Sequence, residues 1–469
     1  MVILKLEKFK TTILIFLVFI SIVLTTRIWL DISIEGIFIM PKNNETGKEN
    51  IKKEYDSITL IKPEKMIINN NGKHTLLFND MEKGTIYSRI LEEGRTFLIN
   101  LLSSKESFPY DILPIEQLNK IRQGSNVEII LPFAYDFEIL SRILGFDKVE
   151  WLDIKNVDSL IMSFDSNVHY ILDKKEEKLY VFGTVDLRSN MKFILDMIEK
   201  FETYSYIFLN EVDSEKYSED VFIPVYSSIH KLPRISAASE IKHEELKDMA
   251  ANFFNIEADS LRSIVEPNGT VIYSDGSGKG MKISRDGLIE YVSYTSGIFL
   301  RKAILSINDL VDIATEFIET HLGFPYDAYI SSIERTDNDG CIIKYNYRYE
   351  GLTIICDSHG LKEPMEIEIA EGKVKKYKRL VRHIKEMGEL KDIKNPLSII
   401  DILYKRLHDK NMNLDEIKIM DAYLAYMEFA SEKDPFMLPV WVLDVITDEG
   451  NRGEYIMNAE TGVILSEPY

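Results

Sequence analysis

The chain has 469 residues, of which 45% are hydrophobic and 11% aromatic, a composition typical of folded domains rather than of disordered segments. This length exceeds what one hydrophobic core usually supports, so we expect several domains. The formal net charge of -20 argues against nucleic acid as a partner, because binding a polyanion needs a clustered basic face.

The first feature along the chain is an uncharged apolar run at residues 11–26, TTILIFLVFISIVLTT. Extended through Arg27 and Trp29 to residue 30, it reaches about the twenty residues that a helix needs to cross a bilayer. A cleaved signal peptide is the alternative, but no A-x-A-like site follows and the run is long for a signal core. We therefore expect a transmembrane helix over residues 11–30, with the lipid bilayer as a partner.

Basic residues lie on both sides of this run, so the flanking charges orient it only weakly. We favour a cytoplasmic tail at residues 1–10, a polar stalk at 31–56, and the rest of the chain outside the membrane. No later segment is long and apolar enough to cross again. The expected protein is thus single-pass, with nearly all of its mass extracytoplasmic.

An amino-terminal α/β ectodomain is expected over residues 57–204. Apolar spacing typical of helices and short apolar runs typical of buried strands alternate along it. Helices are predicted at 84–102, before Leu144 and at 186–201, and strands at 127–133, 168–173 and 178–185.

The remainder repeats a pattern of one helix followed by antiparallel strands, with helices at 240–254, 307–321 and 396–408. Turn residues that tolerate positive φ separate the strands, as at 267–269 and 285–287. We expect a central α+β domain at 205–298 and a carboxyl-terminal α+β domain at 299–469. The predicted fold class is α+β: a transmembrane helix followed by a multi-domain ectodomain of helices packed on antiparallel sheets.

Two cysteines, Cys341 and Cys356, are too few for a disulfide scaffold or a zinc site. They flank an apparent β-hairpin, so a disulfide between neighbouring strands is one alternative outside the cytosol. Two free, buried thiols are the other alternative, which we favour because small buried cysteine is common. The strand register that would decide between them cannot be read from sequence.

Each candidate motif for catalysis or ligand binding lacks a residue that its chemistry requires. His243 lacks the second histidine that a zinc-protease helix needs four residues on, and residues 274–280 lack the first glycine and the hydroxyl of a phosphate loop. We interpret residues 274–280 as a hairpin loop. Tyr345, Tyr347 and Tyr349 alternate along one strand and are interpreted as core packing rather than a recognition surface. We expect no enzyme, no cofactor and no metal.

Residues 253–294 resemble the hallmark segment of the YycH family in both residue types and spacing. The matching residues are Phe253 and Phe254, Leu261 and Arg262, Asn268, Gly269 and Thr270, Tyr273, Ser274, Asp275 and Gly276, and Gly287, Glu290 and Tyr291. Residues 8–30 resemble that family's anchor and 61–80 its first ectodomain strands. Residues 439–465 are similar to the final strands of YycH, YycI and PepSY-type modules.

This resemblance implies a non-enzymatic regulator of the WalK (YycG) sensor histidine kinase, which controls cell-wall metabolism in Gram-positive bacteria. It also implies association with a YycI-like protein and contact with the kinase through membrane helices. Within the span, Ser21, Thr25 and Thr26 are the expected interhelical contacts, because small polar side chains pack and hydrogen-bond between helices in lipid. The PepSY-like ending leaves open a second class, a cell-surface hydrolase or an inhibitor of wall-acting enzymes.

Overall fold

The computed structural model describes residues 57–468, except for 80–83, 104–108, 147–150, 184–187, 199–204, 226–230, 240, 242, 295–304, 326, 337–339, 357–360, 430–434 and 448–449. The described residues belong to one compact unit, Lys53–Tyr469. The tail, transmembrane helix and stalk expected at residues 1–56 lie outside them. Among the helices within the described ranges, none is long and apolar enough to cross a membrane.

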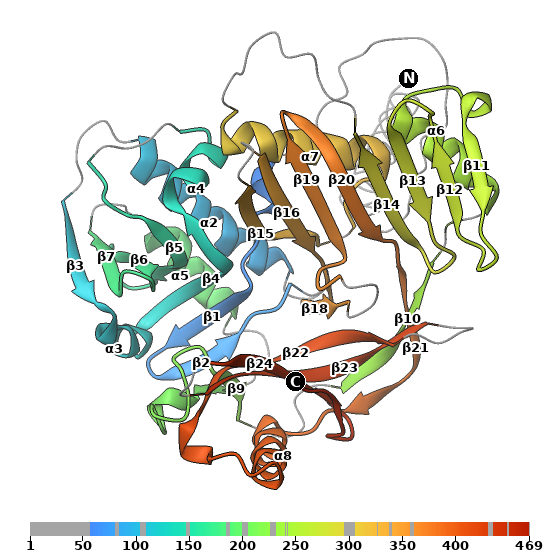
Figure 1. The fold of residues 1–469 in the computed structure, drawn as a ribbon. Coiled ribbons are helices and arrows are strands. Elements are labelled where there is room, and N and C mark those ends of the chain that lie inside the picture. The colour runs from blue at the N-terminus through green and yellow to red at the C-terminus, as the bar shows by residue number, and fades with distance from the viewer. Residues whose placement is uncertain are drawn as a thin grey trace, which may run out of the picture. The chain divides into compact units, whose positions relative to one another are not determined.

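The first sheet has nine antiparallel strands in the order β3-β7-β6-β5-β4-β1-β2-β8-β9 (Figure 1). Its strands are β1 (Lys65–Asn70), β2 (Lys73–Leu76), β3 (Tyr110–Pro114), β4 (Ser125–Asp136), β5 (Asn156–Ser163), β6 (His169–Asp173), β7 (Lys178–Phe182), β8 (Tyr206–Phe208) and β9 (Phe222–Pro224). The accompanying helices are α2 (Gly84–Ser103), α3 (Leu118–Arg122), α4 (Phe137–Ile143) and α5 (Arg188–Ile198).

The predicted helices of this region are confirmed at α2, α4 and α5. On α2, the residues at helical spacing, among them Ile86, Ile90 and Phe97, are buried and form one face toward the core. Asp136 precedes α4, and its carboxylate caps the helix by accepting hydrogen bonds from the N–H groups of Glu138 and Ile139. These helices were therefore predictable from residues within the helix or next to it.

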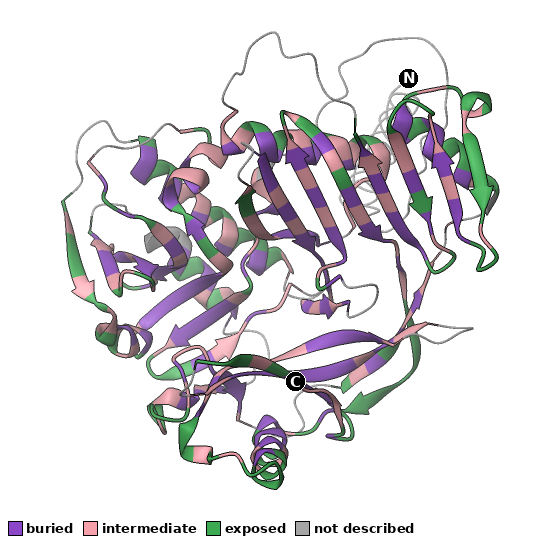
Figure 2. Cartoon of the chain, in the orientation of Figure 1, coloured by how far each residue is buried: buried purple, intermediate pink, exposed green. Residues whose placement is uncertain are grey.

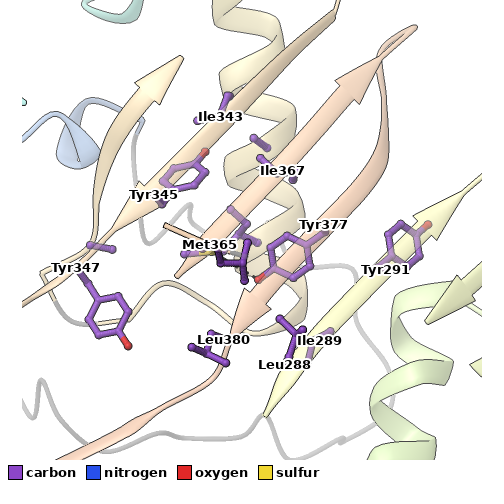
Figure 3. Packing of buried hydrophobic residues seen from close by; sticks show 14 of the residues in the cluster. Leu288, Ile289, Tyr291, Ile343, Tyr345, Tyr347, Met365, Ile367, Tyr377 and Leu380 are labelled. Atoms are coloured by element: carbon purple, nitrogen blue, oxygen red, sulfur yellow. Dashed lines mark hydrogen bonds between the residues drawn. The ribbon is translucent and has the colours of Figure 1, made fainter. Parts of the chain in front are cut away.

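The second sheet has eight antiparallel strands in the order β11-β12-β13-β14-β20-β19-β16-β15. They are β11 (Arg262–Val265), β12 (Val271–Ser274), β13 (Lys279–Ile283), β14 (Leu288–Ser293), β15 (Tyr329–Thr336), β16 (Gly340–Asn346), β19 (Met365–Ala370) and β20 (Lys373–Leu380). Helices α6 (Leu246–Phe254) and α7 (Ile307–His321) pack on it, α7 crossing behind β16, β19 and β20 (Figure 1). The core beneath α7 includes Tyr291, Tyr345 and Tyr377 (Figure 3).

The third sheet runs β17-β18-β22-β23-β10-β21, with β24 added to β23 and β25 to β24. Its strands are β10 (Lys231–Ala238), β17 (Arg348–Tyr349), β18 (Leu352–Ile355), β21 (His383–Asp392), β22 (Ile417–Phe429), β23 (Phe436–Thr447), β24 (Arg452–Asn458) and β25 (Ile464–Ser466). β18 and β22 are parallel and the other pairs antiparallel. Helix α8 (Pro396–Asp409), capped by Asn395, contacts β23.

The α+β class with antiparallel sheets is confirmed, and α6, α7 and α8 occupy the three predicted helix positions. The sheets, however, cross the expected domain boundaries. β8 and β9 follow residue 204 but extend the first sheet, and β14 pairs with β20 across residue 298. The first two predicted helix-and-strand repeats share one sheet instead of forming two. The boundaries at 204 and 298 stay predictions.

Candidate functional site

The chain enters the described fold through residues 57–65, here called the entry segment. It consists of the 3₁₀ turn η1 (Ser57–Leu60) and the residues leading into β1. Leu60 is fully buried in the core of the second sheet, and η1 contacts α7 and β15. The segment that opens the first sheet is therefore packed on the second.

Two polar contacts fix the middle of the entry segment. Lys62 Nζ donates to Asp327 Oδ1 at 3.0 Å, just before β15, and Arg348 Nη2 on β17 donates to the Pro63 carbonyl at 2.7 Å. The Arg348 guanidinium also lies 3.9 Å from the centroid of the Tyr329 ring. Arg348 is buried, so its charge depends on these protein contacts rather than on water.

A third contact fixes the end of the segment. Lys65 Nζ on β1 donates to both carboxylate oxygens of Asp421 on β22, each at 2.6 Å. Glu64 precedes this lysine in the chain, and its negative charge also acts on it. Burial alone would lower the pKa of Lys65, but the charges of Asp421 and Glu64 outweigh it and raise that pKa.

The environment favours the charged form of Lys65 but the neutral form of the two carboxyl groups. Surrounding protein raises the pKa of Glu64 by desolvation, with Lys65 opposing it, and the pKa of Asp421 rises for the same reason. Glu64 is nevertheless open to solvent, which screens its interactions and limits this shift. The site therefore holds the Lys65–Asp421 ion pair, and beside it Glu64 takes up a proton more readily than an ordinary glutamate does.

A small cavity of about 60 Å³ adjoins this ion pair. Two charged residues, Glu64 and Lys65, line it together with mostly apolar residues on or near strands of the first and third sheets. These are Leu76, Phe78, Tyr206, Phe222, Pro224, Gly351, Leu352, Thr353, Ala422, Tyr423, Leu424 and Trp441. Ligand pockets usually measure several hundred Å³, so this cavity has room for water rather than for a substrate.

The signature residues form a second cluster, built on α6 and the hairpins that follow it. Phe253 lies 5.9 Å from Tyr291, 5.7 Å from Phe317 and 4.1 Å from His321, measured between ring centroids. Phe254 lies 6.1 Å from Tyr291. Burial lowers the pKa of His321, so this imidazole belongs to an aromatic core rather than to a solvent-facing site.

Residues 274–280 lie in a hairpin as predicted, with residues 275–278 forming the loop between β12 and β13. The Asp275 carboxylate accepts hydrogen bonds from the Ser277 N–H, the Ser277 hydroxyl and the Lys279 N–H. Lys279 Nζ donates to the Phe254 carbonyl at 2.9 Å, which ties the loop to the end of α6. These contacts hold Asp275 as a turn residue and lower its pKa, although desolvation acts against this.

The remaining signature positions serve the same scaffold. Gly269, Gly276 and Gly287 have positive φ values of 86°, 72° and 94° in successive turns. A Cβ at Gly287 would lie 2.6 Å from Ser239 Oγ and 2.8 Å from the Val381 carbonyl oxygen, so this turn packs closely on its neighbours. Tyr273 is buried, Arg262 lies beside Gly276, and Glu290 faces Lys282 across β13 and β14 on the outer side.

The two cysteines are free and buried, which is the alternative that the sequence analysis favours over a disulfide. Cys341 lies on β16 of the second sheet, while Cys356 follows β18 of the third, because the chain changes sheets between them. Tyr345 and Tyr347 are buried and Tyr349 is half-buried, as the core interpretation predicts. The helix contacts predicted at Ser21, Thr25 and Thr26 lie outside the described residues.

Sequence reasoning missed the contacts of the entry segment. Its partners Asp327, Arg348 and Asp421 lie far along the chain, and no local motif links them to Lys62 or Lys65. One signal was present: Asp421 and Arg348 interrupt strands that otherwise have an apolar and aromatic pattern. A charge inside such a strand indicates a buried partner.

Within the described ranges, no three His, Cys, Asp or Glu side chains are grouped as metal ligands. Residues 7–202 match the family model described as the amino-terminal domain of YycH protein. A search of curated proteins finds no match.

Among solved structures, the crystal structure of YycH from Bacillus subtilis is similar, with a TM-score of 0.55 and 11% sequence identity over 88% of this chain and 98% of that chain. An uncharacterized protein from Eubacterium rectale has a TM-score of 0.36 and 14% identity over 53% of this chain and 91% of that chain. The likeness to the first structure concerns the fold, and it extends well beyond the residues of the family model. Residues 7–202 are thus similar to the amino-terminal domain of YycH proteins, and the chain shares its fold with the Bacillus subtilis YycH structure.

Proposed function

We propose that this chain is a non-enzymatic, membrane-anchored extracytoplasmic regulator of a WalK/YycG-type sensor histidine kinase that controls cell-wall metabolism. The observation that carries this proposal is the family match over residues 7–202, which includes the apolar run and the first sheet except β8 and β9. Similarity to YycH proteins supports regulation associated with this kinase system. In this proposal the amino terminus is cytoplasmic and a YycI-like protein is a second partner.

The span at residues 11–30 contacts the membrane helices of the kinase, with Ser21, Thr25 and Thr26 on the contact face. The entry segment is the covalent route from this span to the folded part. It is held by Leu60 in the second sheet's core, by Asp327 before β15, and by Asp421 on β22. A displacement of the span therefore acts on residues that the second and third sheets hold directly.

Replacing residues 11–30 with an unrelated apolar helix of equal length tests the role of the span. We expect the chain to stay in the membrane fraction while a reporter of kinase-controlled transcription loses its dependence on this protein. Unchanged regulation would count against the span as the contact. Turnover of peptidoglycan or peptides by the purified chain would instead favour a surface hydrolase.

Lys65→Met tests the entry segment separately. It removes the cation that binds Asp421, so we expect weaker regulation when the variant and the unaltered chain are compared at equal protein level in the membrane. Lys344→Met is the matched control, because Lys344 pairs with Glu334 on the outer surface of the second sheet. Equal effects of the two substitutions would contradict a special role for the entry segment.

A further inference from the structure

Strand β11 forms one end of the second sheet and has β12 as its partner among the described strands. All four of its residues are exposed, as Figure 2 shows at the labelled position in Figure 1. Ile264 and Val265 are 67% and 63% exposed. An apolar edge strand with open backbone groups is a template for pairing with another strand.

The hairpin geometry decides which backbone groups face outward. Glu266 N–H donates to the Thr270 carbonyl at 2.8 Å, and the ladder continues with Ile264 opposite Ile272. In an antiparallel ladder, pairs that exchange hydrogen bonds alternate with pairs that do not. Ser263 and Val265 therefore direct their N–H and C=O groups away from β12, toward the free edge.

We propose that the free edge of β11 pairs with the same edge of a second copy of this chain, antiparallel and centred on Ile264. In this register Ser263 faces Val265 of the other copy, so the outward N–H and C=O groups of both strands are matched. Arg262 faces Glu266 of the other copy, and this ion pair occurs twice. A strand that is basic at one end and acidic at the other is complementary to itself in this orientation.

The side chains fit the same register. Arg262, Ile264 and Glu266 share one face of the strand, on which Ile264 lies beside Ile272. The pairing extends this apolar pair into a row of four isoleucines, with an ion pair on either side. It also covers side chains that are otherwise exposed to water.

The pairing is limited at both ends of β11. The Leu261 N–H already donates to the Ala258 carbonyl, and Pro267 has no N–H to donate. The contact is therefore short and two-fold, and each copy uses its only β11 edge in making it. Such a pair closes as a dimer and does not extend into a fibre.

Ile264→Cys in the full chain tests this register directly. Residues at the centre of a pair without mutual hydrogen bonds have Cα atoms about 4.5 Å apart, within the range of a disulfide. We expect mild oxidation to give a cross-linked dimer of twice the 54.3 kDa chain mass on a non-reducing gel. The two native cysteines are buried, so the introduced thiol is the reactive one.

Ile112→Cys is the matched control, because Ile112 is an exposed isoleucine on β3, the edge strand of the first sheet. We expect at least about tenfold more dimer from the β11 variant, since its thiols are held at bonding distance. Equal cross-linking from both positions, or none from Ile264→Cys, would overturn the proposal.

Charge reversal provides a second, independent test in the full chain purified in detergent. Arg262→Glu or Glu266→Arg places like charges opposite each other twice, so each should weaken dimerisation by about tenfold in sedimentation. The double variant Arg262→Glu/Glu266→Arg restores both pairs and should restore the dimer. A dimer that ignores the single reversals, or a double variant that stays weak, would refute this register, provided that melting curves show all variants folded.

Discussion

Replacing Arg382 with methionine tests how the second and third sheets are held together. Arg382 lies between β20 and β21, where the chain leaves one sheet for the other. Its Nε and Nη2 donate to the two carboxylate oxygens of Glu428 on β22 at 2.9 and 2.6 Å, and its Nη1 donates to the Asp286 carbonyl. The two charged side chains are 2% and 3% exposed, so water does not solvate them.

The substitution leaves the Glu428 carboxylate buried without its cation. Breaking a buried pair in this way costs roughly 3–5 kcal/mol. The free energy of unfolding of a domain is about 5–15 kcal/mol, so the loss is about a fifth of it or more. With an unchanged dependence on denaturant, the midpoint of urea unfolding should fall in the same proportion.

Tryptophan fluorescence during urea unfolding measures this loss. Trp441 is buried on β23 and donates from its indole N–H to the Lys394 carbonyl at 3.0 Å, so its emission reports the third sheet. Arg406→Met is the control, since its pair with Glu467 is partly exposed and should contribute at most about 1 kcal/mol.

The double variant Arg382→Met/Glu428→Met removes both charges and leaves an apolar pair. It should recover most of the stability, because an apolar pair of similar volume often matches a buried ion pair. A cost below about 1 kcal/mol for Arg382→Met, or a double variant no more stable than the single one, would refute this reasoning.

Three further predictions concern single positions. Gly287→Ala should lower the free energy of unfolding by about 1 kcal/mol or more, because it combines positive φ with a clash; an unchanged melting temperature would contradict this. Burial raises the pKa of Cys341 and Cys356 to about 12, so a thiol reagent at pH 8 should label them only on unfolding; rapid labelling of the native chain would refute it. The pKa of Glu64 is raised, so the folded chain keeps a proton above pH 4.5 that the unfolded chain releases. Glu64 therefore adds stability that is lost as the pH rises from about 4.5 through its folded pKa, and Glu64→Gln should flatten that decline in melting temperature between pH 4.5 and 8; parallel curves for the two proteins would count against it.

The elements that sequence could predict are those with a local cause. The helix at Ile307–His321 has apolar residues at helical spacing and a capping box formed by Ser306 and Asp309, so its bounds were predictable. The turn at residues 285–287 was equally clear, because Gly287 suits the positive φ that the turn needs.

The sheet to which each strand belongs could not be predicted from the residues of that strand and its neighbours in sequence. Asn346 ends a strand of the second sheet and Arg348 begins one of the third, with Tyr347 alone between them. Tyrosines alternate with polar residues without a break across this point in the sequence, so it was interpreted as one hairpin. The same change of sheets separates Cys341 from Cys356. Pairing between distant segments is decided by packing that no single stretch encodes.

The position of β10 has a consequence for how the chain folds as it is made. In the third sheet β10 lies between β23 and β21, whose residues are synthesised much later. Until residues 383–392 and 436–447 have emerged, both edges of β10 lack these partners. Such delayed pairing is slow and leaves apolar strands exposed to aggregation. Cells that make this chain should therefore depend on holding factors during its synthesis, and a nascent chain stopped before residue 436 should be rapidly degraded.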